Sequence, residues 1–244
     1  MSLLAFRGVS KRFLDGGEQI AVLDRVSFEI EAGETVGLMA SRRGGKTTLL
    51  KVAAGLIPSD DGSVLWGEME LATMSRDEVA VARRESGIAY ARGDWHPSRS
   101  MTVMEFITVS LFGGSATGRE AEHRAEKTLA LLGASHLARQ RTTELGMSER
   151  PIVELARAIA HKPRLLLMDE PAVLNNPDQA REFYELLRSL PAKIGCALLI
   201  ASEEIAPLNG CKPMMRLSDG KLTVPTSRRK VIEFPTRGET SRAS

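Results

Sequence analysis

Residues 38–56 read LMASRRGGKTTLLKVAAGL, and the fold can be worked out from this stretch. The segment ETVGLM, at 34–39, is short and apolar enough for a buried strand, and TTLLKVAAGL has helical spacing that closes at Gly55. Between them, Gly45, Lys46 and Thr47 complete the pattern G-x-x-x-x-G-K-[ST], with Ala40 in place of its first glycine. The stretch therefore predicts a strand, a phosphate-binding loop and a helix in succession.

The chemistry of this loop suits a nucleotide bound with Mg²⁺. Lys46 would place its ammonium on the β- and γ-phosphates, and the Thr47 hydroxyl would bind the metal. Backbone N–H groups would point at the phosphates from the positive end of the helix. The alternative is a glycine-rich turn that contains a lysine by chance. The predicted phosphate contacts are Arg43, Gly44, Gly45, Lys46, Thr47 and Thr48.

A second chemical feature is LLLMDEP at 165–171, a continuous apolar run that ends in two acids. Such a run is typical of a buried parallel strand. Asp169 would hold Mg²⁺ or its water, and Glu170 would orient or deprotonate an attacking water. The alternative is a pair of acids that caps the next helix. With the phosphate loop upstream, the acids predict a site for Mg²⁺ and a nucleoside triphosphate.

Two adjacent arginines, Arg42 and Arg43, stand in the loop where small residues are usual. A glycine serves there because its backbone N–H must approach an anion closely, often at φ angles that a side chain resists. In one arrangement the Arg43 guanidinium folds over the loop and pairs with Asp169 or Glu170. In the other it reaches the phosphates as an extra bidentate donor. We favour the second arrangement, because Lys46, Thr47 and both acids are retained, which is not expected if the loop is permanently blocked.

Composition narrows the class of protein. The 244 residues carry a net charge of only +2, so a nucleic-acid partner is not implied, and 43% of them are hydrophobic, enough to fill a core. Cys196 and Cys211 match no metal or redox spacing, which fits a reduced cytosolic setting. The first residues contain no signal peptide, and no apolar run approaches the length of a membrane span.

The remaining segments predict an α/β fold. Strands are expected in LLAFRGVS, RVSFEIEAGE, DDGSVLWGEME, CALLIAS and PMMRLSDGKL, and helices between residues 101 and 133 and in the segments around 150–160 and 179–190. The expected architecture is a mainly parallel sheet, an N-terminal antiparallel β part and a helical subdomain at about 95–155. Residues 1–224 form the nucleotide-binding domain, and the polar, basic tail 225–244 is expected to be loosely ordered.

In type and order these landmarks resemble the ATPase subunits of ATP-binding cassette (ABC) transporters, from about Leu3 to Leu222. VSKRF resembles the segment whose aromatic, here Phe13, stacks on adenine, while ARAIAHKP and LSDGKL resemble later landmarks. DGGEQIAVLDRVSFEIEAGE and TMSRDEVAVARRESGIAY look most like the lipoprotein-release, macrolide-export and cell-division branch. The resemblance implies a P-loop NTPase core, ATP and Mg²⁺ as cofactors, membrane permease partners, and a cytoplasmic, peripheral location on the inner face of the cell membrane.

The sequence departs from the family pattern at several landmarks. The glutamine that contacts Mg²⁺ is replaced by Gly93, and the histidine that reaches the γ-phosphate is replaced by Ser202. The signature L-S-G-G-Q, which caps the nucleotide of the partner cassette, is degenerate here. Its aligned residues are Leu145, Gly146, Met147, Ser148 and Glu149.

Three functions compete on this basis. The resemblance implies head-to-tail dimers, so a homodimer would have two defective sites, which favours a heterodimer with a more intact ATPase. Glu170 supports an energy-coupling transporter subunit with partner-dependent ATPase activity, our preferred interpretation. Gly93, Ser202 and LGMSE support a pseudo-ATPase with a structural or regulatory role. A soluble ABC protein of repair or translation is least supported, because such proteins carry long insertions or tandem cassettes.

Overall fold

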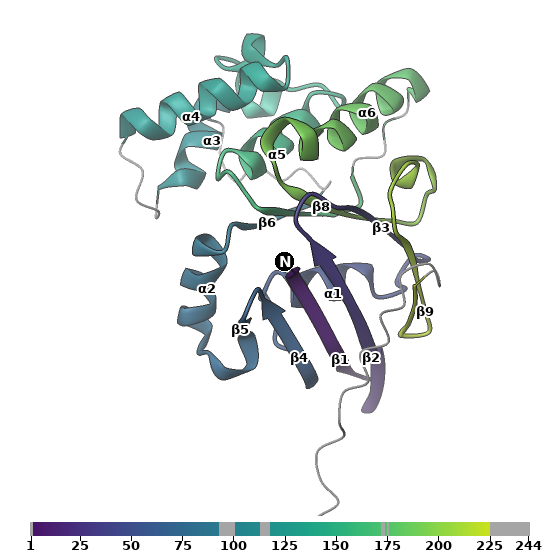
Figure 1. The fold of residues 1–244 in the computed structure, drawn as a ribbon. Helices are drawn as coiled ribbons and strands as arrows, with labels where there is room; N and C mark the ends of the chain where they lie inside the picture. The colour runs from purple at the N-terminus through teal and green to yellow at the C-terminus, as the bar shows by residue number, and fades with distance from the viewer. Residues whose placement is uncertain (1, 93–100, 113–117, 172–173, 175, 225–244) are drawn as a thin grey trace, which may run out of the picture.

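The computed structural model describes residues 2–92, 101–112, 118–171, 174 and 176–224. Two of the features predicted above, Gly93 and the tail 225–244, lie outside these residues. The described chain forms two β-sheets, with helices on both faces of the larger one (Figure 1).

The first sheet is antiparallel and has the strand order β2-β1-β4-β5. Its strands are β1 (Ser2–Asp15), β2 (Glu18–Glu31), β4 (Asp61–Trp66) and β5 (Met69–Glu70). A turn at Gly16 and Gly17 joins β1 to β2, and both glycines have positive φ, the backbone region that a tight hairpin turn requires. This sheet is the expected N-terminal antiparallel part.

The second sheet has the order β10-β9-β3-β8-β7-β6 and is parallel except for its last hairpin. Its strands are β3 (Thr35–Met39), β6 (Ile88–Arg92), β7 (Leu165–Asp169), β8 (Ala197–Ser202), β9 (Met214–Ser218) and β10 (Lys221–Thr223). Every residue of β7 and β8 is buried, as their continuous apolar sequences require.

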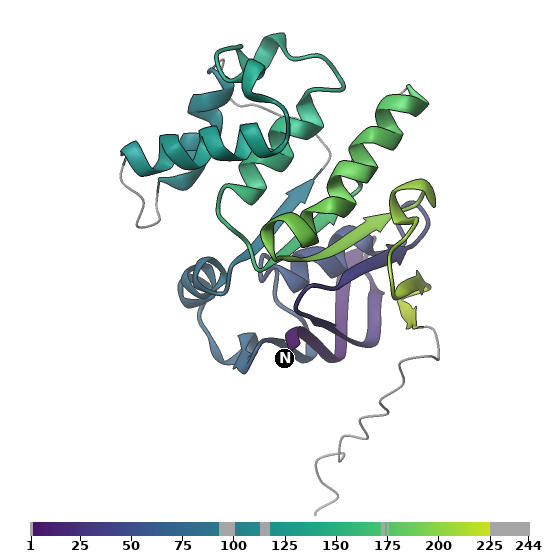
Figure 2. The ribbon, with the colours of Figure 1, turned by 45° about the horizontal axis from the view of Figure 1, so that its top comes forward.

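The helices pack on both faces of this second sheet (Figure 2). On one face, α1 contributes Leu49, Leu50 and Val52 to a core that it shares with both sheets. On the other, α3 to α6 form a second core with apolar side chains of β7 and β8. The helices are α1 (Lys46–Ala53), α2 (Arg76–Glu85), α3 (Val103–Leu111), α4 (Gly118–Leu131), α5 (Arg150–Ile159) and α6 (Pro177–Ile194).

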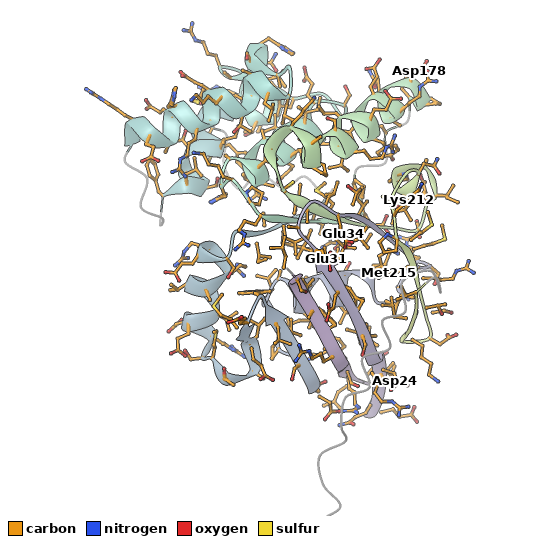
Figure 3. All side chains as sticks on the ribbon, in the orientation of Figure 1. Asp24, Glu31, Glu34, Asp178, Lys212 and Met215 are labelled. Carbon is orange, nitrogen blue, oxygen red and sulfur yellow. The ribbon has the colours of Figure 1, made fainter. Side chains whose placement is uncertain are left out.

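Short hydrogen-bonded contacts fix the strands that carry the site. Between β2 and β3, the Glu34 carboxylate accepts a hydrogen bond from the Glu31 N–H at 3.0 Å (Figure 3). The Asp24 N–H donates to the Gly220 carbonyl at 2.8 Å, which ties the closing hairpin to β2. The two contacts link the antiparallel sheet to the strands of the parallel one.

The α/β fold class predicted from the sequence is confirmed. Strand β6 was not predicted, and neither was α2 as an element, although the start of α2 carries a capping box: the Ser75 hydroxyl accepts from the Glu78 N–H, and the Glu78 carboxylate accepts from the Ser75 N–H. Only Val79 and Ala82 of this helix are buried, so its apolar periodicity is faint. The expected helical stretch at 101–133 contains two helices, α3 and α4.

Candidate nucleotide site

The site lies where three parallel strands end side by side. Strand β8 lies between β3 and β7, with Met39 beside Ser202 and Asp169 beside Ala201. Because parallel strands end at one edge of the sheet, the loop after β3 and the acids at the end of β7 meet there. This is the position at which open α/β sheets bind ligands.

The loop after β3 has the backbone geometry of an anion-binding turn. Gly45 precedes α1 at φ 92°, and a side chain there would lie 3.0 Å from the Val22 carbonyl oxygen, so glycine is required. The Gly44 N–H donates to the Ser41 carbonyl at 2.9 Å. Arg43 adopts φ 61°, a left-handed conformation that an L residue resists. The strain predicted for a residue other than glycine in this loop is therefore present in the backbone of Arg43.

Lys46 is held at the centre of the loop. Its ammonium donates to the carbonyl oxygens of Ala40 at 3.0 Å and Ser41 at 2.9 Å. Its third contact is the Glu170 carboxylate, with 2.9 Å between Nζ and Oε1. The fold thus brings together two residues that are far apart in the sequence and that were both predicted for the site.

Glu170 is fixed from its other side by Ser202. The Ser202 hydroxyl donates to Glu170 Oε2 at 3.0 Å and accepts from the Glu204 N–H at 3.1 Å. Glu170 itself has φ 49°, another left-handed backbone at the site. Ser202 was predicted only as the replacement for a phosphate-contacting histidine, and here its hydroxyl contacts the predicted catalytic carboxylate.

Asp169 is completely buried, and its two oxygens have different surroundings. Oδ2 accepts a hydrogen bond from the Tyr90 hydroxyl at 2.9 Å, and the Arg92 Nε lies 3.8 Å from the same oxygen. Within the described residues, Oδ1 is buried and has no hydrogen-bond partner. Tyr90 could not be predicted from the sequence, because nothing in IAYAR shows that this strand lies beside the acids.

These residues fit Mg²⁺ and a nucleoside triphosphate. Mg²⁺ takes oxygen ligands, and a buried carboxylate oxygen without a partner is a ligand of that kind. The Thr47 and Thr48 hydroxyls lie in the first turn of α1. The same helix offers its N–H groups and positive end to phosphate, next to the Lys46 ammonium. Loop and lysine can bind a triphosphate directly, and the carboxylate can support it as a ligand of Mg²⁺.

Arg43 does not fold back onto the acids. Its side chain is exposed, and among the described residues it makes no ion pair with Asp169 or Glu170. Lys46 makes the pairing with Glu170 that the first arrangement assigned to Arg43. A contact between Arg43 and bound phosphates stays a prediction.

Phe13, the predicted adenine contact, lies on β1 with 43% of its surface exposed. The Lys11 ammonium is 5.5 Å from the ring centroid. The ring forms part of a cavity of about 380 Å³, which is lined by Arg12, Phe13, Leu14, Gln19 and Asp60. An exposed aromatic face beside a cavity is suited to stacking on a base.

The degenerate signature is held by hydrogen bonds within itself and to the residue that follows it. The Glu149 carboxylate accepts a hydrogen bond from the Gly146 N–H at 2.7 Å, and Arg150 Nε donates to the Leu145 carbonyl at 3.0 Å. Met147 is 62% exposed, and Ser148 lies in the turn that leads through Glu149 to the start of α5 at Arg150. One backbone N–H of the segment predicted to face a phosphate therefore already donates its hydrogen bond to a carboxylate of this chain.

A second cavity, of about 710 Å³, lies between α2, β6 and the helices α3 to α5. Its lining is mainly basic and includes Arg83, Arg84, Arg124, Arg157 and His161, against one acid, Glu85. Arg124 and Arg157 are ion-paired with Glu120 and Glu154. Burial and the positive charges of Arg157 and Arg124 lower the pKa of His161. Burial and the charge of Arg84 likewise lower the pKa of Arg83. Apolar Leu56, Val81 and Phe112 border the same cavity and are partly exposed.

Comparison with known proteins gives one consistent family. Residues 23–173 match the family model described as ABC transporter. The methionine import ATP-binding protein MetN of Myxococcus xanthus is 32% identical over 222 residues, which cover 90% of this chain and 66% of that protein. The lipoprotein-releasing system ATP-binding protein LolD of Idiomarina loihiensis is 28% identical over 204 residues, which cover 84% of this chain and 89% of that protein.

Solved structures share the fold. A dimeric ATP-binding cassette in a post-hydrolysis state, bound to ADP and Pi, superposes with a TM-score of 0.78 at 22% identity, covering 92% of this chain and 99% of that one. CbiO1 from Clostridium perfringens, part of an ABC transporter complex, gives a TM-score of 0.79 at 20% identity, covering 91% and 87%. Within the described residues, none of the helices is both long and apolar enough to cross a membrane. On the match over residues 23–173, more than half of its length, the chain belongs to the ABC transporter family.

Proposed function

We propose that the chain is the ATP-binding subunit of a membrane ABC transporter and that it hydrolyses ATP within a dimer of cassettes. The observation that carries the proposal is the meeting of Lys46, Asp169 and Glu170 at one edge of the parallel sheet. The relatives from M. xanthus and I. loihiensis are both named as ATP-binding proteins, of methionine import and of lipoprotein release. The same meeting of residues disfavours the pseudo-ATPase alternative.

Each residue has a defined task in this proposal. Lys46 leaves the Glu170 carboxylate and donates to phosphate oxygens, while Thr47 and Asp169 supply oxygen ligands to Mg²⁺. Mg²⁺ held by these residues would neutralise the charge that develops on the phosphates. Glu170, released from the lysine and still held by Ser202, orients the attacking water and accepts its proton.

The proposed dimer is a heterodimer with a more intact ATPase. The Glu149 carboxylate occupies the Gly146 N–H of this chain's signature, so the signature would bind a facing triphosphate poorly. Replacement of the histidine landmark by Ser202 removes a donor to the transition state, a loss that typically lowers the rate by about 10²–10³. Replacement of the glutamine landmark by Gly93 removes a contact to Mg²⁺. We therefore expect slow hydrolysis by the isolated chain and faster hydrolysis in the complete transporter.

The proposed membrane partner is a permease that holds the chain on the cytoplasmic face of the cell membrane. We infer that the permease contacts the basic cavity between α2, β6 and the helices α3 to α5. This cavity carries more arginines than acids, although Arg124 and Arg157 are paired with Glu120 and Glu154, and it is bordered by exposed apolar side chains. The combination is suited to an acidic, amphipathic segment of a partner.

The test is ATP binding and hydrolysis by the wild-type chain, Lys46→Ala and Glu170→Gln, alone and in the purified transporter. We expect ATP binding that Lys46→Ala weakens at least tenfold, and slow hydrolysis that Glu170→Gln abolishes. Lys51→Ala, in the last turn of α1, is the control and should bind like the wild type. Equal affinities in wild type and Lys46→Ala would contradict the site. Binding without hydrolysis in the complete transporter would establish the pseudo-ATPase alternative.

A further inference from the structure

We propose that Tyr90 is a positioning residue for the magnesium ligand Asp169: its hydroxyl holds Oδ2 and thereby presents Oδ1 to the metal. The inference rests on the proposed binding of Mg²⁺ with ATP, and it assigns a role to a residue outside the motifs that predicted the site. It concerns the neighbouring strand β6, not the phosphate loop.

The sheet places Tyr90 within reach of Asp169. Strand β6 runs parallel to β7, with Arg92 beside Asp169 and Tyr90 beside Leu167. Tyr90 is thus on the adjacent strand, two residues before Arg92, and its long side chain spans the offset. Its hydroxyl donates to Asp169 Oδ2 over 2.9 Å. This hydrogen bond depends on strand order and register, not on a flexible loop.

The two oxygens of Asp169 have unequal partners. Oδ2 has the Tyr90 hydroxyl and, 3.8 Å away, the Arg92 guanidinium, which is too far for a hydrogen bond. Oδ1 is buried without a hydrogen-bond partner among the described residues. A buried acceptor left without a hydrogen bond is destabilising, and a bond to a metal ion would offset that cost. The Tyr90 hydroxyl therefore fixes Oδ2 and leaves Oδ1 available as a metal ligand.

Orientation of this carboxylate matters because Mg²⁺ demands near-ideal octahedral geometry. A carboxylate that rotates about its Cβ–Cγ bond presents its oxygens interchangeably and at changing angles. The Tyr90 hydrogen bond stops that rotation. Removing a partner that orients a metal ligand typically costs about 10–100-fold in metal affinity.

Tyr90 also packs its ring against the core between the two sheets. A purely structural role of the ring would be kept in Tyr90→Phe, which removes only the hydroxyl. The substitution therefore separates positioning of Asp169 from packing. The other tyrosine of the chain, Tyr184, is buried on α6 with its hydroxyl near the charges of Glu204 and Glu170. Tyr184→Phe therefore controls for the loss of a tyrosine hydroxyl close to the site but without the Tyr90 contact.

The experiment measures ATP affinity of the full chain by calorimetry, once in excess MgCl₂ and once in EDTA. The ratio of the two dissociation constants reports how strongly the metal supports nucleotide binding. In Tyr90→Phe we expect this ratio to fall about tenfold, with the EDTA value and the melting temperature unchanged. Electron paramagnetic resonance of Mn²⁺ with ATP should show correspondingly less protein-bound Mn²⁺. Tyr184→Phe should keep the wild-type ratio.

The outcomes separate this inference from the proposed function. Wild-type chain that binds no ATP in either buffer would overturn the proposed function and the inference with it. ATP binding with an unchanged ratio in Tyr90→Phe would overturn the inference alone. An equal fall in both tyrosine variants would also overturn it, since the effect would then not belong to the Asp169 contact.

Discussion

The Lys46 ammonium and the Glu170 carboxylate form an ion pair, 2.9 Å from Nζ to Oε1, across the edge of the parallel sheet. Carbonyl oxygens of the phosphate loop accept the other two N–H groups of the lysine. Lys46 is therefore fully engaged by the protein itself. Phosphate binding through Lys46 has to compete with Glu170 for one of its protons.

Neutralising Glu170 should strengthen ATP binding while it abolishes hydrolysis. Glu170→Gln keeps a side-chain oxygen for Ser202 but loses the charge that holds Lys46. A partly exposed ion pair contributes at most about 1 kcal/mol, so we expect an affinity gain of up to about fivefold. Calorimetric titration with Mg·ATP measures it, with Glu203→Gln as the control. Weaker binding in Glu170→Gln would show that the ion pair does not compete with phosphate.

Replacing Arg43 should raise stability and weaken ATP binding. An L residue at φ 61° is strained by about 1–2 kcal/mol, and glycine relieves this strain. Glycine also gives the unfolded chain more conformational freedom, which lowers the stability of the folded state by about 0.5–1 kcal/mol. Arg43→Gly should therefore be more stable by up to about 1 kcal/mol in urea unfolding. Arg43→Asn, which also tolerates this backbone, separates side-chain loss from backbone relief.

The affinity of both Arg43 variants decides between the two arrangements considered for the loop. Loss of a guanidinium that contacts phosphate should lower ATP affinity several-fold in Arg43→Gly and Arg43→Asn alike. Clearly tighter binding in both would mean that Arg43 obstructs the loop, and the pseudo-ATPase alternative would then be favoured.

Phe13 should contribute to the binding of adenine and not of phosphate. Stacking on an aromatic ring is worth about 1–3 kcal/mol per base, so Phe13→Ala should weaken ATP binding about tenfold. Affinity for inorganic tripolyphosphate should stay the same in a parallel titration. Phe13→Tyr keeps the ring and should bind ATP like the wild type. An equal loss for ATP and tripolyphosphate would place the effect on the phosphates and contradict base stacking.

Removing the charge of Glu149 should strengthen association between cassettes. In Glu149→Gln the Gly146 N–H bonds a neutral amide oxygen in place of a carboxylate, a weaker acceptor that a phosphate of the facing subunit can displace. In a Glu170→Gln background, size-exclusion chromatography with Mg·ATP should show more dimer than without the change. Glu144→Gln, another acid that bonds within this segment, is the control. Dimer formation that does not respond to Glu149→Gln would remove the argument for a self-occupied signature.

Reversing charge in the basic cavity should release the chain from its permease. Arg84→Glu changes an exposed residue of the cavity wall, whereas Arg76→Glu changes the opposite end of α2 and serves as the control. Arg84→Glu should shift the tagged chain from the membrane fraction to the soluble fraction, with ATP affinity unchanged. Equal partition of both variants would place the permease contact elsewhere.

The local parts of the site could be predicted from the sequence. A phosphate loop and a strand that ends in two acids each lie within a few consecutive residues, so their types and spacing are visible directly. The α/β class follows from the same segments. Helix α2 was missed because only two of its residues are buried, although the Ser75 and Glu78 capping pair marks its start.

The contacts between these parts could not be predicted. Tyr90 with Asp169, and Ser202 with Glu170, depend on which strands are neighbours and in what register. Such information is spread over the whole chain. The sequence also suggested Arg43 as a possible partner of the acids, because charge alone does not show that Lys46 is nearer. The left-handed backbone at Arg43 points its exposed side chain elsewhere.

Tyr90 borders the basic cavity as well as donating to Asp169, so one side chain touches both places at which ligands are proposed. A segment that enters the cavity and moves the tyrosine would change the binding free energy of the metal and the nucleotide on the far side of strand β6. Thermodynamic linkage makes this exchange reciprocal: nucleotide must then alter the cavity's affinity for that segment by the same factor. A single phenolic hydroxyl would in that way transmit the state of the nucleotide to the membrane, and the state of the membrane protein back to the nucleotide.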